Sequence, residues 1–272
     1  MTGTLPKGPV RSRTAEAIEA ARAAGRTALV GYLPAGYPDT QTSIEAAVAL
    51  GRHGADVIEL GLPYSDPVMD GPVIQQATTA ALANGFRTRE IFRVVSEVSA
   101  RTDAPVLVMT YWNLVDRMGV DEFCARLAEA GGAGLITPDL VPEEAGEWIA
   151  AADRHGLDRV FLSAPSSPPE RVARTASLCR GFLYAVSVMG VTGEREDVSA
   201  AAQAVVEQAR RAGAENVCVG LGVSRAEHVA EIGRYADGAI VGTALVRAVS
   251  EGGVEAVASL AAELARGTRR KA

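Results

Sequence analysis

The sequence has almost no lysine. Of its 27 basic residues only two are lysines, Lys7 and Lys271, and both lie in the terminal segments. Schiff-base chemistry needs a buried lysine of lowered pKa, which this chain lacks. Histidine is equally scarce: His53, His155 and His228 each fall in or near an expected helix. A three-histidine metal site is therefore not expected, and neither a metal nor a cofactor is predicted.

Other absences narrow the class of protein. The three cysteines have no C-x-x-C spacing and are interpreted as reduced packing residues. Basic residues form no stripe and the formal net charge is −6, so no nucleic-acid partner is expected. No apolar run reaches the length of a membrane span, and the N-terminus lacks the apolar segment of a secretory signal. The sequence therefore predicts a cytoplasmic protein without a membrane partner.

Short apolar segments alternate with helical patterns along the whole chain, at a spacing of roughly 25 residues. The segments expected to form strands are 27–33, 55–60, 105–109, 134–137, 160–163, 182–188, 216–220 and 238–241. Eight such units without a linker favour a single (β/α)8 TIM barrel over residues 1–272, with an extra N-terminal helix at 14–25. No G-x-G-x-x-G follows the first strand, which weakens the alternative of a dinucleotide-binding sheet.

The segment 59–72 differs from the scaffold around it. Glu59 falls at the carboxyl end of a buried strand, where a charged residue has no packing reason to be. Prolines and glycines make the following loop stiff and irregular, and the loop also carries Asp66 and Asp70. Turns are often rich in Asp and Pro, so a solvated turn is one interpretation. The position of Glu59 favours a catalytic loop instead.

In a barrel of this kind the site lies at the carboxyl ends of the strands. The residues just past the strands are Tyr32, Glu59, Asp70, Tyr111, Asp139, Tyr184, Gly193, Gly222 and Gly242. They form an acidic and aromatic group and a glycine-rich group. Glycine loops beside a short helix beginning at Thr243 would bind phosphate through backbone N–H groups, although each glycine could also serve only a tight turn. A phosphorylated substrate is therefore predicted.

These residues leave general acid–base catalysis as the remaining chemistry. Two carboxylates without a catalytic lysine or a zinc site would suit carbon–carbon cleavage or isomerisation. The substrate itself would then have to accept the electrons of the broken bond.

The blocks Glu59-Leu60-Gly61-Leu62-Pro63-Tyr64-Ser65-Asp66-Pro67 and Asp70-Gly71-Pro72 resemble the signature of the tryptophan synthase alpha chain family. The similarity continues through Met109-Thr110-Tyr111-Trp112-Asn113, Pro138-Asp139-Leu140, Gly190-Val191-Thr192-Gly193 and Gly220-Leu221-Gly222. The resemblance implies retro-aldol cleavage of indole-3-glycerol phosphate to indole and glyceraldehyde 3-phosphate.

The resemblance also implies roles for individual residues. Glu59 matches the general acid–base residue, and Asp70 matches the carboxylate that accepts the indole N–H. The residues that match or neighbour the family's substrate-binding positions are Tyr32, Met109, Tyr111, Tyr184, Gly193, Gly222, Gly242 and Thr243, with Thr243 in place of the more usual serine.

A beta chain that receives the indole is the implied partner, in an α2β2 heterotetramer, and Asp66 is the candidate contact to it. Three alternatives remain open at this point: a stand-alone indole-3-glycerol-phosphate lyase, a non-catalytic activator of a beta chain, and a phosphosugar isomerase of similar architecture. Because both Glu59 and Asp70 are present, the activator is less favoured.

Overall fold

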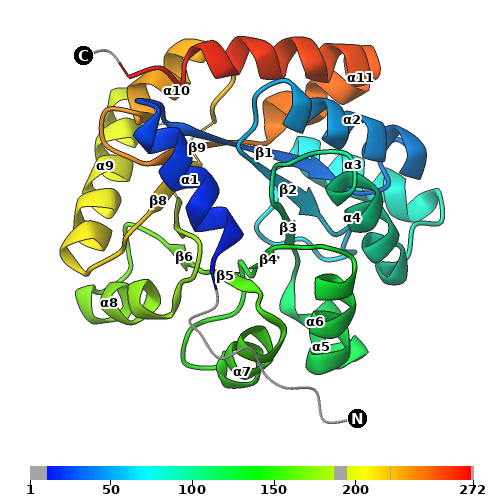
Figure 1. The fold of residues 1–272 in the computed structure, drawn as a ribbon, viewed down its shortest axis with the longest axis horizontal. Coiled ribbons are helices and arrows are strands. Elements are labelled where there is room, and N and C mark those ends of the chain that lie inside the picture. Colours follow the sequence, from blue (N-terminus) through cyan, green and yellow to red (C-terminus); the bar gives the residue numbers. More distant parts are fainter. Residues whose placement is uncertain (1–10, 187–194, 221, 271–272) are drawn as a thin grey trace.

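The computed structural model describes residues 11–186, 195–220 and 222–270, without the side chains of 195–199, as a parallel barrel surrounded by helices (Figure 1). The strands are β1 (Ala28–Pro34), β2 (Val57–Gly61), β3 (Val106–Met109), β4 (Gly134–Ile136), β5 (Asp158–Val160), β6 (Leu162–Ser163), β7 (Leu183–Val186), β8 (Val217–Gly220) and β9 (Gly238–Val241). Their order in the sheet is β5-β4-β3-β2-β1-β9-β8-β7-β6. Only Phe161 separates β5 from β6, so the two edges of the sheet are consecutive in the chain and the sheet closes there. The predicted (β/α)8 barrel is confirmed, with its fifth strand in two pieces.

The helices follow the strands as expected, with small shifts at their ends. They are α1 (Arg13–Ala23), α2 (Thr40–Arg52), α3 (Pro72–Ala83), the 3-10 helix η1 (Thr88–Glu90), α4 (Ile91–Ser99), α5 (Trp112–Met118), α6 (Val120–Glu129), α7 (Gly146–His155), α8 (Pro169–Leu178), α9 (Arg195–Arg211), α10 (Ala226–Ile232) and α11 (Thr243–Arg266). The strand pattern did not predict α5. In the described part of the chain, no helix combines the length and apolarity needed to cross a bilayer.

Alternate residues along each strand face two different cores. On β1, Leu29 and Leu33 pack under the surrounding helices, whereas Val30 points into the barrel. The interior cluster contains Val57 and Leu107 from the neighbouring strands. Successive side chains of a strand point to opposite faces. Because both faces are buried here, the strands read as continuous apolar runs in the sequence.

Helix α1 closes the amino-terminal end of the barrel and crosses its centre in Figure 1. Ile18 and Ala21 are fully buried and belong to the cluster that fills the barrel interior. The backbone N–H of Thr14 donates to the carboxylate of Asp158 at 3.1 Å. At the other end of the helix, Arg22 lies 3.4 Å from Asp237. The floor of the barrel is therefore sealed by an apolar plug held at both ends by polar contacts.

Candidate active site

Glu59 carries a buried carboxyl group with one oxygen atom that has no described hydrogen-bond partner. It lies on β2 opposite Tyr32 of β1 and Leu107 of β3, with 1% of its surface exposed. No described group hydrogen-bonds its Oε2 atom. Burial, and after it the negative charge of Asp70, raises the pKa of Glu59 to about 8. The side chain therefore carries a proton at neutral pH and can donate it.

Asp70 lies at the end of the β2–α3 loop, just before the first turn of α3. Burial raises the pKa of this carboxyl to about 6, so it is mostly ionised at neutral pH. The following Gly71 is the N-cap of the helix and Pro72 its first residue, and the helix dipole favours negative charge there. The Gln75 side-chain amide donates to the Asp70 carbonyl oxygen at 2.8 Å and holds the end of the loop. The two carboxyl groups thus differ in protonation, as a proton donor and a fixed charge require.

A cavity of about 400 Å³ opens at the carboxyl ends of the strands, and both carboxyl-bearing residues line it. Most of the predicted site residues also line it: Tyr32, Met109, Tyr184, Gly222, Gly242 and Thr243. The sequence-based interpretation missed an apolar wall that includes Leu162, Ile240 and Val223. A search for polar strand-end residues could not find these positions, although alternation with helix-facing residues marks Leu162 and Ile240 as interior.

Tyr111, predicted to bind substrate, is placed beside the catalytic loop and is not among the residues that line the cavity. Its hydroxyl accepts a hydrogen bond from the backbone N–H of Met69 at 2.9 Å. The ring stacks on Tyr64, with centroids 5.1 Å apart, and Asn113 donates to the Tyr64 hydroxyl at 3.2 Å. Next to it, the carboxylate of Asp139 accepts the N–H of Trp112 at 2.9 Å. These side chains fix the loop between Glu59 and Asp70 from outside.

The glycine-rich side of the cavity has the open backbone that a phosphate site needs. Gly222 has φ of +52°, and a Cβ atom added to it would meet no atom within 4 Å. Gly242 precedes Thr243, the first residue of α11, whose amino end faces the cavity. Non-helical Gly252 and Gly253 separate this first, short part of α11 from its terminal part, as the sequence predicted. Free N–H groups at such a helix end bind anions. Gly193, predicted to join this site, lies outside the described residues.

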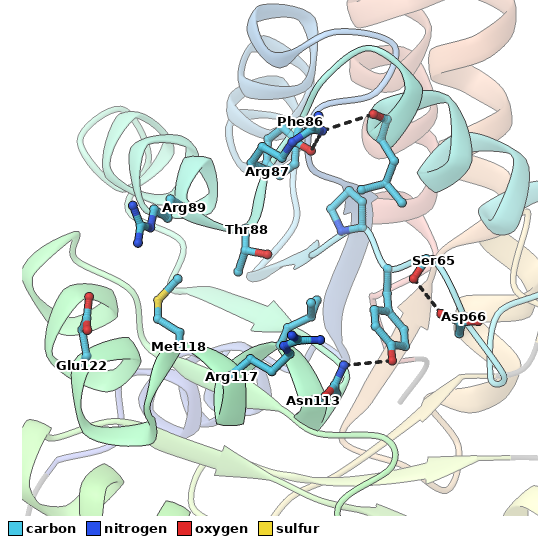
Figure 2. A pocket seen from close by; sticks show the side chains of 14 residues that line it. Ser65, Asp66, Phe86, Arg87, Thr88, Arg89, Asn113, Arg117, Met118 and Glu122 are labelled. Carbon is cyan, nitrogen blue, oxygen red and sulfur yellow. Dashed lines mark hydrogen bonds between the residues drawn. The ribbon is translucent and has the colours of Figure 1, made fainter.

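Asp66 is exposed on the other side of the loop, away from the catalytic cavity. It lines a separate hollow of about 670 Å³, shown in Figure 2, together with Arg87, Arg89 and Arg117. Its carboxylate accepts a hydrogen bond from the Ser65 hydroxyl at 2.6 Å. This hollow is larger than the cavity at the strand ends, but Glu59, Asp70 and the glycine loops do not line it.

Comparison with known proteins gives one consistent result. A family model described as "Tryptophan synthase alpha chain" matches residues 18–271. The tryptophan synthase alpha chain of Leifsonia xyli is 61% identical over 259 residues, which cover 95% of this chain and 99% of the relative. That of Mycobacterium avium is 55% identical and covers 96% of both.

Solved structures agree with the sequence relatives. A chain of the aminoacrylate-bound tryptophan synthase of M. tuberculosis superposes with a TM-score of 0.88 at 48% identity, covering 95% of this chain and all of that one. A chain from the α2β2 complex of Pyrococcus furiosus gives a TM-score of 0.81 at 38% identity and covers 88% and 97%. The similarity therefore spans the whole barrel and both sides of the cavity.

Proposed function

This chain belongs to the tryptophan synthase alpha chain family, and on that premise we propose that Glu59 and Asp70 are its catalytic pair. The reaction is the cleavage of indole-3-glycerol phosphate to indole and glyceraldehyde 3-phosphate, with indole passed to a beta chain. The enzyme is a carbon–carbon lyase. The observation that carries the assignment is the buried Glu59, with a carboxyl oxygen that has no described partner, in the same cavity as Asp70.

Glu59 supplies the proton that starts the cleavage. Its proton goes to C3 of the indole ring, which places a positive charge on the ring and weakens the bond from C3 to the glycerol chain. The resulting carboxylate then takes the proton of the adjacent glycerol hydroxyl as that carbon becomes an aldehyde. A carboxyl group with a pKa of about 8 gives up and regains a proton readily near neutral pH.

Asp70 balances the charge that the ring acquires. The protonated indole spreads its positive charge to N1, and a carboxylate that accepts the N1 hydrogen stabilises that state more than the neutral ground state. Preferential stabilisation of the charged state lowers the barrier. The apolar wall of Met109, Leu162 and Ile240 offers the indole ring a dry surface and strengthens the electrostatic effect.

The glycine loops hold the phosphate end of the substrate. Backbone N–H groups around Gly222 and Gly242, with the Thr243 hydroxyl and the amino end of α11, form a cradle without lysine or arginine. Tyr184 lines the same cavity, with its hydroxyl oxygen 2.7 Å from a Cβ atom built on Gly220. We include Gly193 in the cradle on the family motif alone.

A beta chain is the partner of this family, and we propose the α2β2 heterotetramer as the working form of this protein. Asp66 faces outward from the loop that joins Glu59 to Asp70, so a contact there would reach both catalytic groups through one short segment. A cytoplasmic location, and the absence of nucleic-acid and membrane partners, remain part of the proposal.

Turnover of indole-3-glycerol phosphate by the purified chain, with and without the beta chain of the same organism, tests the function. Slow turnover alone and faster turnover with the beta chain are expected. Full activity without any stimulation would indicate a stand-alone lyase. Stimulation of the beta chain without cleavage of the substrate would indicate an activator and contradict the catalytic pair.

A further inference from the structure

Two tyrosines in the cavity share one packing arrangement. Tyr32 on β1 lies opposite Glu59 of β2, and a Cβ atom on Gly61, two residues farther along β2, would lie 2.2 Å from the Tyr32 hydroxyl oxygen. Tyr184 on β7 pairs with residue 218 of β8, and a Cβ on Gly220 would lie 2.7 Å from its hydroxyl oxygen. Each ring therefore leans over a glycine of the next strand, and each tyrosine lines the cavity.

The Tyr32 ring is fixed by its neighbours. It is 5% exposed and packs with Ala77 and Val246, and a Cβ on Gly242 would lie 3.5 Å from its Cδ1 atom. Within the described residues, no group hydrogen-bonds the Tyr32 hydroxyl, although a buried tyrosine hydroxyl normally has a partner. A rigid ring thus presents an unused hydroxyl group in the cavity.

That hydroxyl is a donor and not a base. Burial, followed by the negative charges of Asp70 and Glu59, raises the pKa of Tyr32 well above its ordinary value. It therefore keeps its proton at every pH at which the enzyme would be assayed.

The strand geometry shows where the donor lies. Residues two apart on a strand are separated by roughly 6–7 Å, so the hydroxyl over Gly61 is about one such step beyond Glu59, toward the open end of the barrel. The phosphate cradle of Gly222, Gly242 and Thr243 also lies at that open end. A substrate with its indole C3 at Glu59 and its phosphate in the cradle must run its glycerol chain past Tyr32.

We propose that Tyr32 is a further catalytic residue, whose hydroxyl donates a hydrogen bond to the glycerol oxygen that becomes the aldehyde oxygen. The proposal rests on the proposed function. As the carbon–carbon bond breaks, its electron pair goes to the protonated ring and the hydroxyl proton goes to Glu59. The oxygen forms its second bond to carbon, and Tyr32 holds it in place while keeping its own proton. Glu59 therefore transfers protons without also having to orient the oxygen.

Tyr32→Phe tests this assignment because it removes one oxygen atom and keeps the ring between Gly61 and Gly242. We expect kcat for indole-3-glycerol phosphate, measured with the beta chain present, to fall about 100-fold, the low end of the range for the loss of one such donor. KM should change less than about twofold. Indole-3-propanol phosphate, which lacks both chain hydroxyls, should bind as tightly as it does to the wild type.

Tyr37→Phe is the matched control, because Tyr37 packs beside the same cluster but does not line the cavity. It should leave kcat unchanged. A Tyr32→Phe variant that keeps more than about half of the wild-type kcat would overturn the proposal and leave the proposed function intact. Weaker binding of the propanol analogue would mean that Tyr32 serves packing. If kcat/KM of Tyr32→Phe rose with pH at a different value from that of the wild type, Tyr32 would act on the ionisation of Asp70 instead. A wild-type enzyme without turnover would instead refute the proposed function, and the proposal with it.

Discussion

Among the described residues, buried carboxyl groups have hydrogen-bond partners at one end of the barrel, whereas at the other end a buried carboxyl oxygen lacks one. At the amino-terminal end, Asp237 is 2% exposed and accepts the N–H of Val217 at 2.9 Å, with Arg210 3.1 Å away. Burial raises the pKa of Asp158 there too, but hydrogen bonds from Thr14 work against that rise. At the carboxyl-terminal end, Glu59 is as deeply buried, yet one of its oxygen atoms has no described partner.

The difference separates groups that hold the fold from groups that perform chemistry. A buried carboxylate surrounded by donors satisfies their hydrogen bonds, and removing it leaves those donors without an acceptor. A buried carboxyl group without donors stays protonated and contributes little to stability in its charged form. Burial alone therefore does not identify a catalytic residue, whereas burial without partners, facing a cavity, does.

The largest expected effect is on the unpaired carboxyl group. Glu59→Gln keeps the shape of the side chain but cannot release a proton. The kcat for indole-3-glycerol phosphate should therefore fall by about 10⁴-fold or more, the upper end of what general acid–base catalysis contributes. Steady-state assays with the beta chain measure this directly. Retention of more than about a tenth of the wild-type rate would show that Glu59 is not the proton donor.

The same variant should not weaken the fold. In the folded chain Glu59 holds its proton up to a pH of about 8, whereas the unfolded chain releases it near its ordinary pKa of about 4.3. The wild type therefore loses about 1.4 kcal/mol of stability per pH unit between those values, and the glutamine variant does not. The Tm of Glu59→Gln should therefore be higher than that of the wild type at pH 8.5, and the difference should disappear toward pH 4.5. A lower Tm throughout would mean that Glu59 has a structural partner.

Loss of a paired carboxylate should have the opposite pattern. Asp237→Ala leaves the buried N–H of Val217 without an acceptor and removes the partner of Arg22 and Arg210. Unfolding free energy should fall by about 2–4 kcal/mol, less than for a fully buried pair because both arginines are partly exposed. Calorimetry should show Tm lower by roughly 5–15 °C, with kcat at 25 °C close to wild type.

Glu97→Ala removes the exposed partner of Arg93 on α4 and serves as its control, with an expected change below about 1 kcal/mol. If Asp237→Ala strongly reduced kcat at 25 °C, where the variant is still folded, the division between the two ends of the barrel would be wrong.

The pH dependence of activity should report the two different protonation states at the carboxyl-terminal end. kcat/KM requires Asp70 ionised and Glu59 protonated, so it should rise through a pH of about 6 and fall through about 8. In Asp70→Asn the residual activity should keep the alkaline limb and lose the acidic one. An acidic limb that survives in Asp70→Asn would have to come from another group.

The smallest expected effect concerns the outer side of the catalytic loop. Asp66→Ala should leave the slow turnover of the isolated chain near wild type and reduce stimulation by the beta chain several-fold, about 1–3 kcal/mol of coupling. Ser65→Ala, which removes the hydroxyl that bonds Asp66, is the milder companion variant. Equal losses with and without the beta chain would make Asp66 a structural residue of the loop.

The sequence was sufficient for the repeating architecture and for the placement of Glu59, because strand alternation and a charge at a strand end are local signals. The break at Phe161 and the helix α5 were not predictable in this way. The helix begins at Trp112, whose N–H is capped by Asp139 from the loop after β4, and such a contact depends on the closed barrel. That the whole of 1–272 forms one domain remains a prediction.

Side-chain roles showed the same limit. Tyr111 follows a strand just as Tyr32 and Tyr184 do, but its hydroxyl is directed to Met69 and not to the cavity. The lean of the Tyr32 ring depends on the absence of a side chain at Gly61, on a different strand. Strand-end position therefore identifies which residues can reach the site, and contacts between strands decide which of them do.

The plug formed by Ile18 and Ala21 has a consequence for the order of events in a catalytic cycle. With the floor of the barrel filled, the substrate of the proposed reaction would enter the cavity from the carboxyl ends of the strands. The proposed phosphate cradle and both carboxyl-bearing residues line this one cavity. Under the proposed function, a beta chain seated at that end would receive the indole and would also control when the next substrate enters.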